Sequence, residues 1–339
     1  MPSFSLKLPD AKATNQFRQL ALILLLVTII YTPETFPGEF SESPSKRFNG
    51  FVLGQSPLIP ANEIHHGGPP RDGIPSIDQP KFINTEMADY LHDTDRVLGI
   101  RVNNTPKAYP VSILNWHEIV NDGDTLISYC PLCGTGMAFN TEAANFGVSG
   151  LLYNSDMLLY DRKTKSLWSQ IPGKAISGER KGESLEMLAV ENTSWQHWRN
   201  LHPDTLVLSR NTGFNRDYAN SPYGNYATNG ALYFPVSARS RQYHPKEKVT
   251  GIELNDIYKA YPFSELAKNR RGLNPLQVSE VVIVKDKIAE ENIEIHFYPQ
   301  HQSATVRSSS GKTLPSLTSY WFAWFAFHPQ TKIYTHTQK

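Results

Sequence analysis

The sequence predicts a β-rich α+β fold with two pseudo-repeated lobes. The composition favours strands joined by many loops, because the 339-residue chain contains 16 Tyr, 16 Phe and 24 Pro. An internal repeat is the second observation: VLGIRVNNTPKAYPVSIL at 97–114 and VTGIELNDIYKAYPFSEL at 249–266 are identical at ten of eighteen positions, at a constant offset of 152. Chance does not produce such agreement, so the two segments predict two related structural units.

A further repeat marks the ends of these units. Five residues recur 126 positions downstream: Trp195, Trp198, His202, Pro203 and Thr205 return as Trp321, Trp324, His328, Pro329 and Thr331. We therefore expect lobes at about 85–210 and 240–339 within a globular domain that spans residues 60–339. Each copy of the first repeat is typical of a strand, an Asn-centred turn, a strand, and a helix that opens at Pro110 or Pro262.

The N-terminus carries a pattern typical of exported proteins. Two lysines and Arg18 precede the apolar run Leu20–Ile30, which is the order of a secretory signal. The run is short for a membrane span and no small-residue cleavage site follows closely, so we interpret residues 1–31 as a signal peptide or an uncleaved membrane anchor. Residues 32–59 are interpreted as a tether. The expected location is extracytoplasmic, in the periplasm or at the cell surface.

The charge of the chain excludes some classes of partner. The net charge is +1, only 19% of the residues are charged, and no basic tract occurs, which argues against nucleic-acid binding. No residue pattern indicates a nucleotide cofactor. A membrane is a partner through the N-terminal segment if that segment is uncleaved, and no pattern singles out a small-molecule or protein partner.

The only two cysteines of the chain, Cys130 and Cys133, stand in the sequence SYCPLCGTGM. The β-prone run Thr125–Tyr129 places the first of them at the end of a strand. Pro131 restricts φ, and Gly134 allows the positive φ that turns backbone amides toward the sulfurs. The sequence Gly-Thr-Gly then opens a helix poorly, whereas a thioredoxin-type CxxC begins one. The local pattern is that of one half of a rubredoxin or zinc-ribbon site.

The second copy of the repeat lacks the cysteines and a histidine together. Its continuation FSELAKNRRGLNPLQVSEVVIVKDK aligns Asn269 with His117 and contains no cysteine. A joint loss is expected if His117 and the cysteines form one site that a single lobe keeps. A helix predicted from Pro110 to Asn121 supports this hypothesis, because it places His117 on the inward stripe that holds Leu114. A histidine satisfied within the core is the competing interpretation.

The leading hypothesis is a copper or zinc site formed by Cys130, Cys133 and His117, in a metal-handling protein or a metalloenzyme. Met137 and Met157 are candidate thioether ligands for copper, although core packing is the simpler role for both. A thiol–disulfide oxidoreductase that uses the two cysteines is the first alternative. The second is a ligand-binding module that uses the aromatic loop 210–230, with a structural cysteine pair.

Residues 146–171 predict strands on both sides of a turn that begins at Asp161. Asn154, Ser155 and Asp156 interrupt the apolar pattern of these strands. Polar residues at such an interruption are candidates for the lining of a pocket.

Long motifs of the chain resemble those of an extracytoplasmic, largely bacterial family of unknown function. The motifs are GGPPRDGIPSID at 67–78, AYPVSILNWHEIVND at 108–122, SYCPLCGTG at 128–136, FGVSGLLYNSDMLLYDRKTKSLWSQ at 146–170 and RDYANSPYGNY at 216–226. The resemblance covers roughly residues 60–330. It implies that His117, Cys130 and Cys133 belong to the family's own motifs, and it brings no established reaction, substrate or fold.

Overall fold

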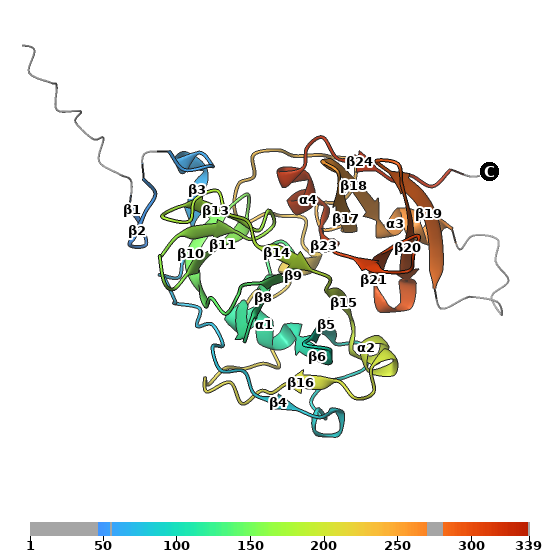
Figure 1. Ribbon diagram of the computed structural model, residues 1–339, viewed down its shortest axis with the longest axis horizontal. Coiled ribbons are helices and arrows are strands. Elements are labelled where there is room, and N and C mark those ends of the chain that lie inside the picture. Colours follow the sequence, from blue (N-terminus) through green and yellow to red (C-terminus); the bar gives the residue numbers. More distant parts are fainter. Residues whose placement is uncertain (1–46, 55, 270–280, 338–339) are drawn as a thin grey trace, which may run out of the picture. The chain divides into compact units, whose positions relative to one another are not determined.

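The computed structural model describes residues 47–54, 56–269 and 281–337 (Figure 1). The predicted signal peptide or anchor at 1–31 lies outside these residues, as does most of the predicted tether. Strands make up 40% of the structure and helices 14%, which confirms the predicted β-rich α+β class. Within the described segments, no helix combines the length and the apolar character needed to cross a membrane.

The described strands form six sheets, and in four of them strands that are distant in the chain lie side by side. The sheets, with strands in order of pairing, are β1 (Arg47–Phe48) and β2 (Phe51–Val52); β13 (Lys174–Ser177), β12 (Leu167–Ser169), β11 (Asp156–Asp161), β10 (Phe146–Tyr153) and β3 (Ile64–His66); β14 (Glu186–Leu188), β9 (Thr135–Asn140), β8 (Thr125–Cys130) and β7 (Ile119–Asp122); β15 (Glu191–Ser194), β5 (Arg96–Val102), β6 (Thr105–Pro110), β16 (Leu206–Leu208) and β4 (Phe82–Ile83); β23 (Leu317–Tyr320), β17 (Lys248–Leu254), β18 (Ile257–Pro262) and β24 (Lys332–Ile333); and β19 (Val282–Ile288), β20 (Glu291–Tyr298), β21 (Ser303–Ser308) and β22 (Thr313–Leu314). The helices are α1 (Val111–His117), α2 (Trp195–Leu201), α3 (Phe263–Lys268) and α4 (Trp321–Phe327), with short 3-10 turns at Ala61–Glu63, Thr85–Met87, Tyr226–Thr228 and Pro299–His301.

The two copies of the repeat form the same succession of elements. In each copy an antiparallel hairpin, β5–β6 or β17–β18, is flanked by an antiparallel strand on one side and a parallel strand on the other. The registers correspond, since Val97 pairs with Pro110 and Val249 pairs with Pro262. Both hairpins turn through two consecutive residues with positive φ, as a type I′ turn requires.

The tryptophans of the second repeat explain why its spacing is kept. The indole Nε1 of Trp198 donates to Thr205 Oγ1 at 2.9 Å, and Trp324 donates to Thr331 Oγ1 at 2.9 Å. Each indole covers a glycine of the central hairpin, where a Cβ would overlap the ring. The extents of the two lobes remain a prediction, because the described residues from Arg47 onward belong to one compact unit that is not divided between the lobes.

The sheet that carries the cysteines has a counterpart in the second copy. Its order β14-β9-β8-β7 matches the order β22-β21-β20-β19, and the first strand after the helix carries Asp122 or Asp286, which binds the lysine and tyrosine of the preceding KAY sequence. The loop after β8 therefore corresponds to the loop after β20, at Tyr298–Gln302. Alignment of the two copies by sequence gives the cysteines no counterpart. In the structure, the equivalent position of the second copy is a loop without cysteines.

The predicted helix from Pro110 to Asn121 is wrong at its end. Helix α1 stops at His117, and Glu118 adopts a left-handed conformation with φ 58° and donates its amide to the Leu114 carbonyl. The next residues form β7, because the β-branched pair after Glu118 is completely buried against β8. Asn121 therefore lies on a strand, whereas Leu114 and His117 keep the expected inward stripe of α1 and are both buried.

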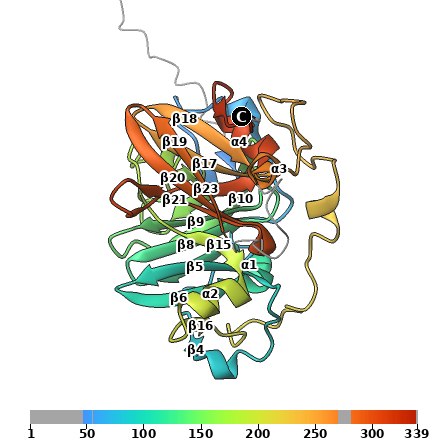
Figure 2. The ribbon, with the colours of Figure 1, turned by 90° about the vertical axis from the view of Figure 1, so that its right-hand side faces the viewer.

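Packed structure begins before residue 60. In the described part of the predicted tether, Phe51 and Leu53 are buried, and the ring of Phe51 lies 5.1 Å from that of Tyr160. The amide of Leu58 donates to the Ile176 carbonyl at 2.9 Å. Strands β8 and β9 lie between the β5–β6 and β17–β23 strands (Figure 2), so the cysteine loop is enclosed by both copies of the repeat.

Candidate metal centre

The cysteine loop is short, buried and bent by glycine. Cys130 ends β8, as the sequence predicts, and pairs with Thr135 of β9. Cys133 lies in the connecting turn, where Gly134 has the expected positive φ of 63°. Both cysteines are free thiols, with exposed fractions of 2% for Cys130 and 0% for Cys133.

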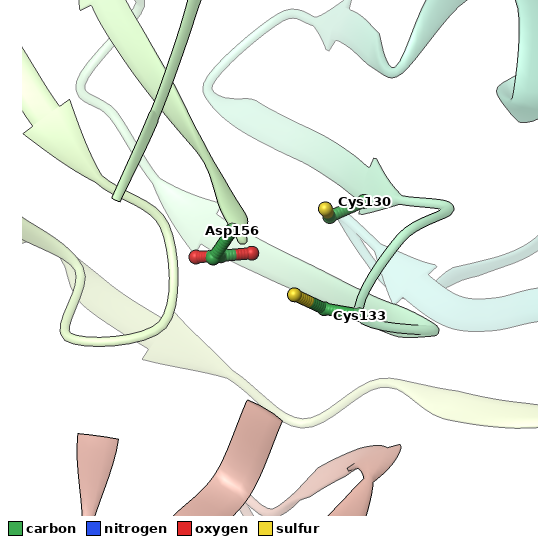
Figure 3. Close-up of side chains that lie close together, drawn as sticks. All are labelled: Cys130, Cys133 and Asp156. Atoms are coloured by element: carbon green, nitrogen blue, oxygen red, sulfur yellow. The ribbon is translucent and has the colours of Figure 1, made fainter. Parts of the chain in front are cut away.

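A carboxylate from a distant hairpin completes a group with the two sulfurs. Asn154 and Ser155, with φ of 52° and 65°, form the tight turn between β10 and β11, and Asp156 is the first residue after it. One ligand atom each of Cys130, Cys133 and Asp156 lies within 4.8 Å of the other two (Figure 3). The three side chains point toward one another from two separate segments.

Hydrogen bonding leaves part of this group unsatisfied. The Ser155 carbonyl accepts from Cys133 Sγ at 3.3 Å, with Cys130 Sγ at 3.9 Å. Asp156 Oδ2 accepts from the Ile171 amide at 3.2 Å. Asp156 Oδ1 is buried and has no partner at hydrogen-bond geometry among the described residues, although the two thiols and the Met157 amide lie near enough to the carboxyl group to lower its pKa in part. Such an atom is costly unless a proton or a cation compensates it.

Burial favours the neutral form of all three groups. It raises the pKa of Asp156 from 3.8 to about 7. It raises the pKa of Cys130 above 9.0 and, with the repulsion of neighbouring groups, raises the pKa of Cys133 well above 9.0. In the described part of the chain no lysine, arginine or histidine forms an ion pair with Asp156. A bound cation would favour the ionised forms instead.

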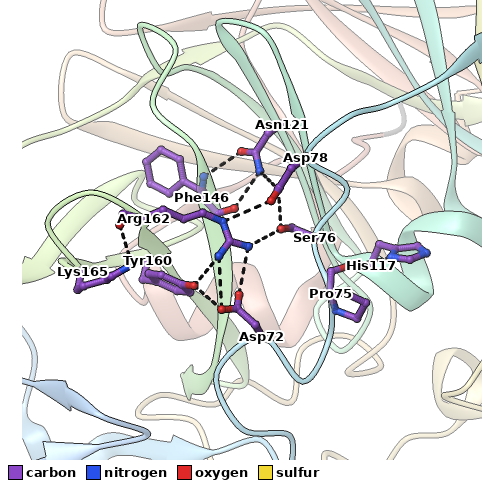
Figure 4. A network of polar contacts seen from close by, with 10 residues as sticks. All are labelled: Asp72, Pro75, Ser76, Asp78, His117, Asn121, Phe146, Tyr160, Arg162 and Lys165. Atoms are coloured by element: carbon purple, nitrogen blue, oxygen red, sulfur yellow. Dashed lines mark hydrogen bonds and ion pairs between the residues drawn. The ribbon is translucent and has the colours of Figure 1, made fainter. Parts of the chain in front are cut away.

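His117 does not belong to this group. Its Nδ1 lies 2.8 Å from the Pro75 carbonyl oxygen and its Nε2 lies 2.7 Å from the Tyr218 hydroxyl, so both ring nitrogens have partners. Burial lowers the pKa of His117 below its usual value. The histidine ties α1 to the 72–78 segment, which Arg162 holds through Asp72 and Asp78 (Figure 4). These contacts agree with the competing interpretation, in which His117 is a core histidine whose two ring nitrogens are both hydrogen-bonded.

Sequence reasoning missed Asp156 as a partner of the cysteines. The sequence carries a signal for it, because residues 154–156 interrupt an apolar pattern with polar side chains. The sequence alone does not predict that Asp156 contacts the cysteines, because it lies 23 positions beyond Cys133. Met137 and Met157 are both 2% exposed and pack in the same core cluster as the two cysteines.

Two cavities adjoin the cysteine loop. An apolar cavity of about 370 Å³ is lined by Leu132, Met157 and Phe234 together with Glu118. A second cavity, of about 430 Å³, is lined by Pro131 and Gly134 and by several cationic and tyrosine side chains. Tyr223, from the aromatic loop 210–230, lines both cavities.

Glu118 is an acid–base candidate in the apolar cavity. The turn after α1 directs this side chain, rather than His117, into the cavity. Its Oε1 accepts from the Tyr223 hydroxyl at 2.6 Å, and burial raises its pKa from 4.5 to about 7. A carboxyl group that titrates near neutral pH is suited to proton transfer.

Comparison with known families gave one result that covers most of the chain. The family described as "Protein of unknown function (DUF3179)" matches residues 71–331. Comparisons with curated proteins and with solved structures found no match.

Proposed function

This chain belongs to the DUF3179 family of proteins of unknown function, and we propose that it is a metalloprotein that binds zinc through Cys130, Cys133 and Asp156. The observation that carries the proposal is the meeting of three ligand atoms within 4.8 Å of one another at a buried place. One of their oxygens, Asp156 Oδ1, has no partner at hydrogen-bond geometry among the described residues.

The chemistry of the group favours a divalent cation. Three buried acids that lie together must stay protonated or share a positive charge. A divalent ion supplies that charge and replaces the thiol protons, so its binding is coupled to proton release.

The ligand types favour zinc over copper. Thiolates bind both zinc and copper(I), whereas the carboxylate oxygen is a ligand that zinc accepts more readily than copper(I) does. Three protein ligands leave a fourth position for water or a substrate, which is the arrangement of catalytic zinc sites. Together with Glu118 in the adjoining cavity, this supports a metalloenzyme rather than a metal store.

The thiol–disulfide oxidoreductase remains the alternative, and the thiol pKa values weigh against it. The thiolate is the nucleophile in thiol exchange, and burial raises the pKa of both thiols above the usual value. A structural cysteine pair beside a ligand-binding aromatic loop is the third possibility.

Metal content, measured together with thiol titration, tests the proposal. The full-length protein is purified without added metal, and its zinc and copper are measured by mass spectrometry. We expect about one zinc per chain. The variants Cys130→Ser, Cys133→Ser and Asp156→Asn should lose it, whereas His117→Gln should keep it.

Two outcomes contradict the proposal. Metal-free protein that fails to bind added zinc and contains a disulfide favours the oxidoreductase. Zinc that survives Asp156→Asn but is lost in His117→Gln returns the ligand role to His117.

A further inference from the structure

The second cavity beside the cysteine loop is strongly basic. Arg96, Lys246 and Lys248 line it, and Pro131 and Gly134 form the part nearest the cysteines. In the described part of the chain, none of the three cations forms an ion pair with a carboxylate. Four tyrosines also line it, Tyr129, Tyr223, Tyr226 and Tyr320.

The repeat brings two of these cations together. Arg96 and Lys248 are the first residues of β5 and β17 and differ by the repeat offset of 152. Both line the same cavity, so the two copies contribute like charges to one place. The Arg96 guanidinium contacts the Asn192 side chain and the carbonyls of Asn192 and His301, all of which are uncharged acceptors.

Lys246 is the most unusual of the three. It is only 7% exposed, and its ammonium group is buried without a hydrogen-bond partner in the residues that the structure describes. Its Nζ lies 3.0 Å from the centre of the Tyr226 ring, with the rings of Tyr320 and Phe322 at 5.2 and 5.0 Å. Aromatic faces stabilise a cation in part, but they do not replace an oxygen acceptor.

We propose that this cavity is a binding site for a small oxyanion, a molecule with at least two negative charges on phosphate or carboxylate groups, held by Lys246, Lys248 and Arg96. The anion supplies the acceptors that Lys246 lacks and offsets the repulsion between Arg96 and Lys248. The tyrosine rings add flat surfaces for the rest of the ligand.

The electrostatics agree with this geometry. Burial lowers the pKa of Lys246 to about 8 and, with repulsion from Arg96, lowers the pKa of Lys248 to about 7. Neither lysine therefore has enough negative charge nearby in the free protein to keep its pKa at the usual value. The proposal does not depend on the zinc site.

Calorimetric titration with two probes tests the site. Inorganic phosphate and malonate are titrated into the full-length protein at low ionic strength, and the zinc content is measured in the same samples. We expect at least one probe to bind at millimolar concentration or below, more weakly as salt is added. The probe that binds better identifies the charged group of the ligand.

Variants decide whether the lysines are responsible. Lys246→Met and Lys248→Met should each weaken binding about tenfold to a hundredfold, because each removes a charged contact. Lys312→Met, at an exposed turn outside the cavity, should leave it unchanged. If Lys246→Met does not fold, the half-buried Lys248 provides the test. The proposal is overturned if neither probe binds, or if both cavity variants bind as the Lys312 variant does.

Discussion

The amide of Tyr320 donates a hydrogen bond of 2.9 Å to the backbone carbonyl of Cys133. Tyr320 belongs to the second copy of the repeat, so the copy without cysteines holds the loop that carries them. The contact continues at Gly134, where an added Cβ would come within 2.9 Å of the Tyr320 ring.

Gly134→Ala should therefore disturb the cysteine loop. Gly123 is a matched control, because it has the same φ of 63° and no atom within 4 Å of an added Cβ. Gly123→Ala should cost about 1 kcal/mol of unfolding free energy, the conformational penalty alone. Gly134→Ala should cost about 1–3 kcal/mol more and reduce zinc content. Urea unfolding and metal analysis measure both effects, and equal costs would show that the Tyr320 contact is unimportant.

Asp156→Asn should act in opposite directions on stability and on metal binding. In the zinc-free protein at pH 8 it removes a buried carboxyl whose pKa burial raises to about 7, so the unfolding free energy should rise by about 1–3 kcal/mol. Zinc affinity should fall at least about tenfold. Denaturation of zinc-free protein and competition with a chelator measure the two effects. If the unfolding free energy of the zinc-free protein falls together with the zinc affinity, the aspartate has a structural role instead.

Glu118 should make stability depend on pH. Burial raises its pKa from 4.5 to about 7, so the folded protein keeps a proton that the unfolded chain releases. Its contribution to stability is therefore lost as pH rises from about 4.5 to about 7, by up to about 3 kcal/mol. Glu118→Gln should stabilise the protein at pH 8 relative to pH 5, and the exposed Glu179→Gln should not. Urea unfolding at the two pH values checks this, and parallel changes in both variants would contradict it.

His117→Gln should lower stability and spare the metal. The substitution disturbs buried hydrogen bonds to the Pro75 carbonyl and the Tyr218 hydroxyl, at a cost of about 1–3 kcal/mol. Zinc content should match that of the unmodified protein. Tyr218→Phe, which removes one of the two bonds, should cost less. Metal loss in a folded His117 variant would count against the ligand set proposed here.

Export remains a prediction that rests on Arg18 and the apolar run Leu20–Ile30, which lie outside the described residues. Alkaline phosphatase fused after residue 45 should be active, because that enzyme needs an oxidising compartment for its disulfides. A matched fusion in which Leu24 and Leu25 are replaced by Arg should be inactive. Activity in both fusions, or in neither, would contradict export through this segment.

Local chemistry made part of the structure predictable. The turn residues of the repeats, the strand before Cys130 and the positive φ of Gly134 all follow from residues within a few positions. The order of strands in the cysteine sheet could not be predicted, because it depends on pairing between distant segments.

The same limit explains why the predicted helix ran past His117 and why Asp156 was omitted. The end of α1 is set by the pairing of β7 with β8, which overrides a pattern that suits a longer helix. Asp156 reaches the sulfurs only because the β10–β11 hairpin packs beside the cysteine loop. The sequence does not identify the counterpart loop at Tyr298–Gln302 for another reason. That loop shares only a proline with the cysteine loop, at Pro131 and Pro299.

The depth of the cysteine group has a kinetic consequence. Cys130, Cys133 and Asp156 are at most 2% exposed, so the three ligands shield an ion held there from a chelator, which is too large for the one position left open, unless the chain opens locally. Loading then accompanies folding, and exchange in the finished protein proceeds at the slow rate of that opening. A folded protein purified without metal would accept zinc slowly, and one that acquired zinc while folding would retain it through long dialysis.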